Sequence, residues 1–131
     1  MARLTAGAPA TQMDLAACAR PTTLHLWSLA KVQVRLGPSW TMRGEDGVAV
    51  MCGGYIFRDR ETCEGWFMAA PSARRHMLEI VRFIRLTGIP APYRRAIVFA
   101  STPEGRRIAL ACGYRAMSHR QDGMEVLEWA V

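Results

Sequence analysis

The segment ETCEGWFMAAPSARRHMLEIVRFIR, Glu61–Arg85, decides the fold that we expect for this chain. Its first part, Glu61–Ala70, is predicted to be a strand that ends at Pro71, because proline cannot continue a β-ladder. Ser72 can cap a helix, so a helix is predicted from Ser72 to about Leu86. Four apolar residues at helical spacing would give that helix a core-facing stripe: Met77, Ile80, Val81 and Ile84.

The sequence after this segment predicts one further strand and helix and a closing pair of strands. RAIVFA, Arg95–Ala100, is a short apolar run typical of a strand buried on both faces. We expect it to lie next to and parallel with the Glu61–Ala70 strand, because a helical crossover joins the two. A helix should begin at Pro103 and end at Gly113. The last two strands are expected around a polar turn, at Tyr114–Ser118 and Gly123–Trp129.

The sequence before the segment predicts a β-hairpin. SWTMR, a polar GEDG turn and VAVMCGGYIF cover Ser39–Phe57 in the pattern of strand, turn and strand. Gly53 and Gly54 in the second strand indicate a bulge or a close approach of another backbone. Earlier still, the pattern indicates an edge strand and two helices: Arg3–Ala6, Thr11–Ala19 and a helix capped by Thr22 or Thr23. Val32–Leu36 alternates as a strand would, so helix and strand both stay open there.

This order of elements predicts an α/β (mixed α+β) fold. We expect one domain over residues 1–131, with a central mixed, mostly antiparallel sheet and helices on both faces. Half of the chain is apolar and 21% is charged, which is typical of a globular protein. No apolar run is long enough to span a bilayer, and the first residues make a poor secretion signal. The expected location is therefore the cytoplasm, without a membrane partner.

The basic residues are almost all arginine, since Lys31 is the only lysine in a chain of net charge +6. Guanidinium groups bind phosphate and carboxylate in a bidentate manner, so nucleic acid, a phosphorylated cofactor or an acidic protein would fit. A GC-rich coding sequence would also produce this bias. No nucleic-acid-binding motif accompanies the charge, so any binding of nucleic acid is expected to be non-specific.

The four cysteines and three histidines are scattered through the chain: Cys18, Cys52, Cys63, Cys112, His25, His76 and His119. No two cysteines have the spacing of a zinc knuckle or of a redox motif. We therefore expect four buried, reduced thiols and no metal site.

The helix-Gly-Tyr unit ALACGYRAM, before the final strand pair, resembles the GNAT superfamily of acetyl-CoA-dependent N-acetyltransferases. WFMAAP is similar to the central strand of that family, which runs into a proline. The run WFMAAPSARRHMLEIVRFIR, together with RRIALACGYRAM, looks more narrowly like the GNAT-like proteins of tailed bacteriophages, some of which are internal virion proteins. The resemblance covers Trp40–Trp129, and the first forty residues only by the order of their elements.

The resemblance implies a place for acetyl-CoA. Backbone amides of the central strand would pair with the pantetheine arm, here at Trp66, Phe67 and Met68 and on to Ala70. The pyrophosphate would lie at the start of the next helix, where the family has a glycine-rich loop. This chain has no glycine there, because Arg75, Met77 and Glu79 stand at the positions concerned. Arg74, Arg75 and His76 are then the candidates for holding phosphate by their side chains.

The family's catalytic positions are also altered. The tyrosine that protonates the leaving thiolate in many members corresponds to Ala109, and the frequent asparagine corresponds to Thr102. Tyr114 follows the glycine, where the family has a core aromatic, so packing is its expected role. Glu61 and Glu64 are the carboxylates on the central strand, and Glu64 is the candidate general base because it is nearer the expected splay point.

Three functions follow from these observations. The first is a catalytically degenerate GNAT-fold protein that acts as a virion-associated or protein-interaction module, in the host cytoplasm or in the virion. Its expected partner is an acidic protein surface, including another virion component, contacted by free arginines at Arg106 and Arg107. The alternative is an acetyl-CoA-dependent N-acetyltransferase with an atypical pyrophosphate loop. A basic nucleic-acid-binding protein ranks third.

Overall fold

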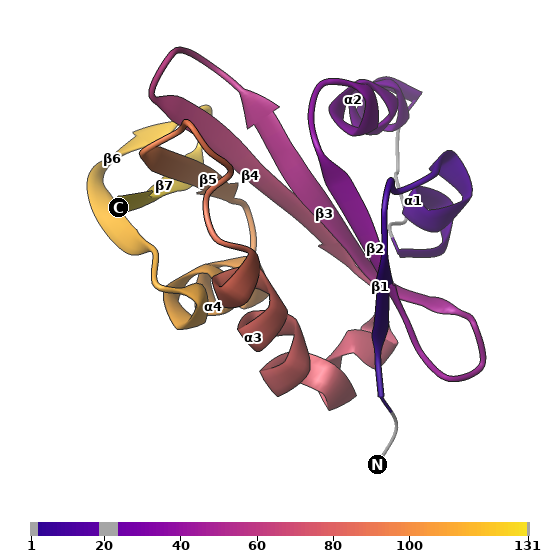
Figure 1. Ribbon diagram of the computed structural model, residues 1–131. Helices are drawn as coiled ribbons and strands as arrows, with labels where there is room; N and C mark the ends of the chain where they lie inside the picture. The colour runs from indigo at the N-terminus through magenta and orange to yellow at the C-terminus, as the bar shows by residue number, and fades with distance from the viewer. Residues whose placement is uncertain (1–2, 19–23, 131) are drawn as a thin grey trace. The chain divides into compact units, whose positions relative to one another are not determined.

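The computed structural model describes residues 3–18 and 24–130. Within these ranges the chain forms seven strands, four α-helices and one 3₁₀-helix, which Figure 1 shows. The strands are β1 (Thr5–Gly7), β2 (Ser39–Arg43), β3 (Ala49–Phe57), β4 (Thr62–Ala69), β5 (Arg95–Ala100), β6 (Arg115–Gln121) and β7 (Met124–Ala130). The helices are α1 (Gln12–Cys18), α2 (Leu24–Arg35), the 3₁₀-helix η1 (Pro71–His76), α3 (Met77–Thr87) and α4 (Pro103–Cys112).

The strands form one sheet in the order β1-β2-β3-β4-β5-β7-β6. β4 and β5 pair in parallel, with Thr62 opposite Arg95 and Glu64 opposite Ile97. The pairs β1–β2, β2–β3, β5–β7 and β6–β7 are antiparallel. The predicted mixed, mostly antiparallel sheet and its parallel central pair are therefore confirmed.

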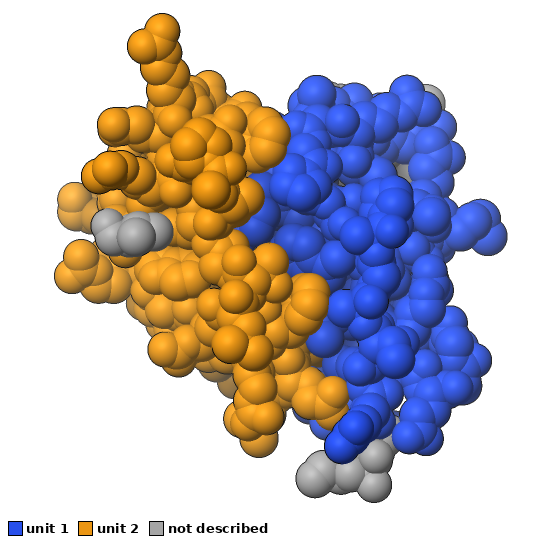
Figure 2. Space-filling view, viewed as in Figure 1, with its two compact units in different colours: residues 1–56, 66–77 blue, residues 57–65, 78–131 orange. Residues whose placement is uncertain are grey.

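The chain divides into two compact units, which Figure 2 draws in blue and orange. Unit 1 comprises Met1–Ile56 and Trp66–Met77, and unit 2 comprises Phe57–Gly65 and Leu78–Val131. Strand β4 thus contributes its first half to unit 2 and its second half to unit 1. The expectation of one domain over residues 1–131 stays a prediction.

The core of unit 1 lies between α1 and the β2–β3 hairpin. Leu15 on α1 and Cys52 on β3 are almost completely buried and belong to one apolar cluster. The first turn of α1 is closed by a capping box, because the Asp14 amide donates to Thr11 Oγ1 and the Thr11 amide donates to a carboxylate oxygen of Asp14.

The Asp14 carboxylate also fixes α1 to β2. It accepts hydrogen bonds from Thr41 Oγ1 and from Arg43 Nη2, each at 2.7 Å. Burial raises the pKa of Asp14, but the hydrogen bonds from Thr41, Arg43 and Thr11 outweigh burial and lower it below its usual value. The carboxylate therefore stays ionised inside the unit.

The predicted hairpin is confirmed, and its glycines make a close backbone approach. A Cβ atom at Gly53 would lie 2.8 Å from the carbonyl oxygen of Trp66, and one at Gly54 would lie 2.4 Å from that of Pro38. Both positions therefore require glycine. The register of the β2–β3 pairing shifts elsewhere in the hairpin, between Met42 and Arg43.

In unit 2, the apolar stripe of α3 and strand β5 supply the core. Ile80 and Ile84 on α3 are buried as predicted, as is Ala96–Val98 on β5. Met77 and Val81, the other two residues of the predicted stripe, are half-buried. Helix α4 begins where expected, because Thr102 Oγ1 accepts from the Gly105 amide and Pro103 takes the first turn. It ends at Gly113, whose φ of 107° suits glycine.

Some element boundaries differ from the prediction. Helix α3 begins at Met77 and not at Ser72, because the intervening residues form η1, in which the Ala73 amide donates to Ala70 O at 2.9 Å. The open segment Val32–Leu36 is helical up to Arg35, in α2. The edge strand is Thr5–Gly7 in place of Arg3–Ala6. The expected caps Thr22 and Thr23 lie outside the described residues.

Strand β6 stands last in the sheet order, and most of its side chains are exposed. It continues to Gln121, beyond the predicted end at Ser118, and turns into β7 through Asp122 and Gly123. Both turn residues have positive φ, 51° and 78°, as a two-residue hairpin turn of type I′ requires. None of the helices in the described ranges is long and apolar enough to cross a bilayer.

Candidate functional site

The second half of β4 and the 3₁₀-helix that follows it carry all six predicted cofactor residues, and all six belong to unit 1. Trp66, Phe67 and Met68 lie on β4, and Arg74, Arg75 and His76 form the last turn of η1. The chain thus passes from the candidate pantetheine strand into the candidate phosphate segment without a break. Whether these residues bind a cofactor stays a prediction.

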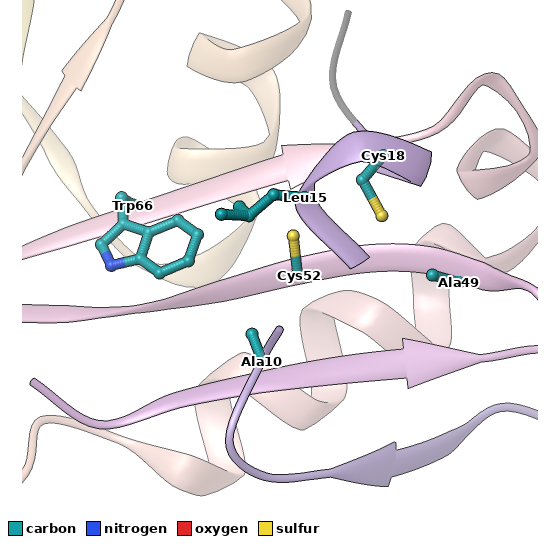
Figure 3. Packing of buried hydrophobic residues seen from close by; sticks show 6 residues of the cluster. All are labelled: Ala10, Leu15, Cys18, Ala49, Cys52 and Trp66. Atoms are coloured by element: carbon teal, nitrogen blue, oxygen red, sulfur yellow. The ribbon is translucent and has the colours of Figure 1, made fainter. Parts of the chain in front are cut away.

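Trp66 is the buried member of the strand group. Its side chain is 9% exposed and packs in the core cluster of unit 1, where Figure 3 shows Leu15 beside it. The indole Nε1 is buried and has no hydrogen-bond partner among the residues that the structure describes. A buried donor without an acceptor is costly, so this N–H lowers the stability that the packing of Trp66 contributes.

The candidate phosphate segment, Arg74, Arg75 and His76, is basic and contains no glycine. Arg74 and Arg75 are exposed and His76 is half-buried. The residue before η1, Ala70, offers no side-chain cap, and the first turn contains no acid. An anion at this segment would be held by guanidinium groups, which remain charged at all physiological pH values.

Glu64, the candidate general base, lies on the first half of β4 in unit 2 and has an arginine partner. Its carboxylate oxygen is 3.1 Å from Arg58 Nη1, and its side chain is 22% exposed. The guanidinium carbon of Arg58 lies 5.6 Å from the ring centre of Phe99. Burial raises the pKa of Glu64, and the charge of Arg58 opposes that shift. A carboxyl with a raised pKa is better matched to a proton transfer near neutral pH.

The alternative carboxylate, Glu61, is exposed. Its backbone carbonyl accepts hydrogen bonds from the amides of Arg94 and Arg95, at 3.0 and 3.1 Å. Glu61 therefore has a structural role through its main chain, and Glu64 is the better candidate base.

The structure confirms the packing role expected of Tyr114 in unit 2. Tyr114 is 5% exposed and packs against Trp129, with ring centres 5.8 Å apart and the planes tilted by 56°. Ala109 is buried and has no group that can donate a proton. Thr102 is occupied as the cap of α4.

The expectation that Arg106 and Arg107 are both free is wrong for Arg106. Arg106 Nε donates to Glu125 Oε2 at 2.8 Å, because the β5–β7 pairing brings Glu125 on β7 to the start of α4. Arg107 is exposed, as predicted. Their role in binding a partner stays a prediction.

All four cysteines are free and buried, as predicted. Sequence reasoning missed that Cys18 on α1 and Cys52 on β3 are hydrogen-bond partners. It also missed Arg58 as the partner of Glu64, for which the turn Arg58-Asp59-Arg60 before β4 was the available signal. No group of three or more potential metal ligands occurs in residues 3–18 and 24–130.

The strand order, the parallel β4–β5 pair and the closing β6–β7 hairpin define the GNAT acetyltransferase fold. The structure resembles the IAA acetyltransferase from Bacillus cereus ATCC 14579 over 100% of both chains, with a TM-score of 0.70 and 13% identity. It resembles a Bacillus subtilis acetyltransferase in complex with CoA over 100% of this chain and 99% of that chain, with a TM-score of 0.65 and 12% identity.

A third similar structure is a GNAT family acetyltransferase from Elizabethkingia anophelis with acetyl-CoA bound. It matches over 99% of this chain and 98% of that chain, with a TM-score of 0.66 and 13% identity. No protein-family model matches the sequence, and no curated protein matches it at a significant level. At identities this low, the structural similarity establishes the fold alone, and the activity is argued from the residues.

Proposed function

We propose that this protein is an N-acetyltransferase that takes an acetyl group from acetyl-CoA and transfers it to an amine. The observation that carries the proposal is the GNAT fold, shared over nearly the full chain with acetyltransferases, including two with CoA or acetyl-CoA bound. The half-buried Glu64, whose raised pKa suits a general base, supports it. This favours the alternative expectation from the sequence over a degenerate fold.

The residues present fit acetyl-CoA, although not through a glycine loop. Arg74 and Arg75 are exposed and would contact the phosphates by charge. The backbone of Trp66, Phe67 and Met68 would bind the pantetheine arm, as the resemblance implies. When bound, acetyl-CoA supplies an activated thioester carbonyl.

The chain's own contribution to the reaction is proton transfer. An acceptor amine loses a proton as its nitrogen forms the new N–C bond and the C–S bond of the thioester breaks. Glu64 accepts that proton on a carboxylate oxygen, while Arg58 holds the carboxylate in place. Ala109 supplies no proton to the leaving sulfur, so that proton would come from solvent.

The direct test is calorimetric titration with acetyl-CoA, followed by an assay for thiol release with a panel of amines. We expect binding that weakens as salt is raised, since side-chain charge replaces backbone amides at the phosphates. No binding at low salt, with the fold intact, would contradict the proposal and restore the degenerate interpretation.

The pH dependence tests the role of Glu64 separately. Because the carboxyl must be ionised to act as a base, kcat/KM should rise as pH increases through its raised pKa. Glu64→Gln should remove this limb and lower turnover by roughly 10²–10⁴-fold. Arg58→Ala should move the limb to higher pH, since the charge of Arg58 lowers the pKa of Glu64. Glu61→Gln is the matched control, and an unchanged limb in Glu64→Gln would exclude Glu64 as the base.

We also propose a protein-binding face on α3, which the exposure of two leucines favours. Leu78 and Leu86 are 83% and 80% exposed, and they lie on one side of the helix with Arg82 and Arg85. This side of the helix combines apolar and basic groups, with Glu79 at its border, and it fits an amphipathic segment of an acidic partner protein. The expected virion role is one case of such a partner and stays a prediction.

This face is testable with an amphipathic helical peptide that has leucines at helical spacing on one face and glutamates beside them. Its affinity, measured by fluorescence anisotropy, should fall at least tenfold in the variant Leu78→Ser with Leu86→Ser. Leu110→Ser on α4, a less exposed leucine, is the control. Equal binding by both variants, or preference for anionic lipid vesicles over the peptide, would contradict a protein-binding face.

A further inference from the structure

Two of the four cysteines face each other across the core of unit 1. Cys18 is the last residue of α1 and Cys52 lies in the middle of β3, and they are 6% and 0% exposed. The two side chains are hydrogen-bond partners. Figure 3 shows their sulfur atoms directed into the space between helix and strand. Cys63 and Cys112 are also free and buried, but they lie in unit 2.

The charge environment makes the two sulfurs unequal. The hydrogen bond from Cys52 lowers the pKa of Cys18, against the effects of burial and of the Asp14 carboxylate. The same hydrogen bond, together with burial, raises the pKa of Cys52. Arg43, which is paired with Asp14, also favours the Cys18 thiolate. Cys18 is also the more exposed of the two, so it is the member that a small oxidant reaches first.

Cys63 and Cys112 have no such partner. Burial raises the pKa of each to about 11, and nearby Arg85 opposes the shift at Cys112 only in part. Both therefore remain thiols at neutral pH, where the thiolate is the reactive form. The chain contains two reactive candidates and two matched buried controls.

We propose that Cys18 and Cys52 are an oxidation site, at which a hydroperoxide converts the pair into an intramolecular disulfide between α1 and β3. Cys18 attacks the peroxide O–O bond, so that hydrogen peroxide is reduced to water and Cys18 becomes a sulfenic acid. Cys52 then attacks the Cys18 sulfur, which forms the S–S bond and releases a second water. The two thiols lose two electrons and two protons, which the peroxide receives.

The disulfide would fasten α1 covalently to the strand against which it packs. Cys18 precedes α2 and β2, and Cys52 lies within β3, so the cross-link would close a loop that contains α2, β2 and the hairpin turn. A cross-link between residues so far apart in sequence restricts the unfolded chain more than the folded one. The oxidised protein should therefore melt about 5–15 °C higher than the reduced protein.

The experiment uses the full chain under native conditions. The reduced protein is treated with hydrogen peroxide, then denatured and alkylated, and its mass is compared before and after reduction with dithiothreitol. We expect two of the four thiols to become protected, one cross-linked peptide pair containing Cys18 and Cys52, and full recovery on reduction. Cys63→Ser and Cys112→Ser should behave in the same way as the unchanged chain.

Single variants separate the two roles. With Cys52→Ser the sulfenic acid on Cys18 has no resolving thiol and should be trapped by dimedone, whereas Cys18→Ser should give no adduct at Cys52. Four free thiols after treatment, cross-links between chains, or faster oxidation of Cys63 or Cys112 would overturn the proposal. Oxidation that occurs only at urea concentrations that unfold the protein would overturn it as well.

Discussion

Two segments of this protein begin with the same pattern, a proline, two further residues and then a pair of arginines. One is PSARR, Pro71–Arg75, in η1, and the other is PEGRR, Pro103–Arg107, at the start of α4. They occur in different units of the chain. Their surroundings differ, and the difference indicates which pair of arginines is available to a ligand.

At α4, neighbouring groups already satisfy the helix start. Thr102 Oγ1 accepts from the Gly105 amide at 3.0 Å, and Glu104 places an acid in the first turn. Arg106 is paired with Glu125. At η1 there is no side-chain cap and no acid in the first turn, and Arg74 and Arg75 are exposed. The same local sequence is therefore structural in one place and a candidate anion site in the other.

The largest effect should separate the two arginine pairs in acetyl-CoA binding. Arg74→Ala with Arg75→Ala should weaken affinity roughly 10–100-fold, as expected for lost hydrogen bonds to charged groups. Arg106→Ala with Arg107→Ala should change it less than about twofold. Titration with S-acetylpantetheine, which lacks the phosphates, is the control and should not distinguish the variants. Equal losses in both double variants would show that the comparison is wrong.

The two helix starts should also differ in stability. Thr102→Ala removes a cap and should lower the free energy of unfolding by about 1 kcal/mol. Ser72→Ala should have an effect close to zero, since no side chain caps η1. Urea denaturation of both variants measures the difference. A loss at Ser72 similar to that at Thr102 would mean that η1 is capped after all.

A smaller effect is expected when η1 is made to resemble α4. Ser72→Glu places a carboxylate where α4 has Glu104 and should weaken acetyl-CoA binding about threefold, because the new charge opposes the phosphates. The effect should disappear at high salt. Ser72→Gln has a similar size without the charge and should bind as the unchanged chain does.

The smallest effect concerns the ion pair that occupies Arg106. Glu125→Gln should cost less than about 0.5 kcal/mol of stability, because Arg106 is largely exposed. Thermal unfolding at low and high salt measures it, with Glu61→Gln as the unpaired control. A cost above about 1 kcal/mol would show that the pair stabilises α4 more than its exposure indicates.

The sequence predicted most elements because their signals are local. The β2–β3 hairpin has alternating residues around a polar turn, and α4 begins at Thr102-Pro103 and ends at Gly113. The start of α3 was misplaced because the choice between a 3₁₀ and an α-helical turn after Pro71 depends on packing. Val32–Leu36 stayed open for the same reason, since alternation over five residues fits either state.

The candidate site was predictable only where one segment carries it. Glu64, Trp66 and Arg74 lie within a single run of the chain and could be named. The pairing of Arg106 with Glu125 depends on the sheet register, which places β7 beside β5. The contact of Cys18 with Cys52 depends on how α1 packs on β3. Contacts between residues this far apart in the sequence cannot be predicted from the spacing of the residues.

Strand β6 has a consequence for the behaviour of the protein in concentrated solution. As the last strand in the sheet order, it offers backbone groups to which a strand of another copy can add. Its exposed side chains include Arg115 and Arg120, so approaching copies meet like charge along this edge. Salt weakens that repulsion by screening the charges. The protein should therefore remain dispersed best in buffer of low ionic strength and should begin to associate edge to edge as ionic strength rises.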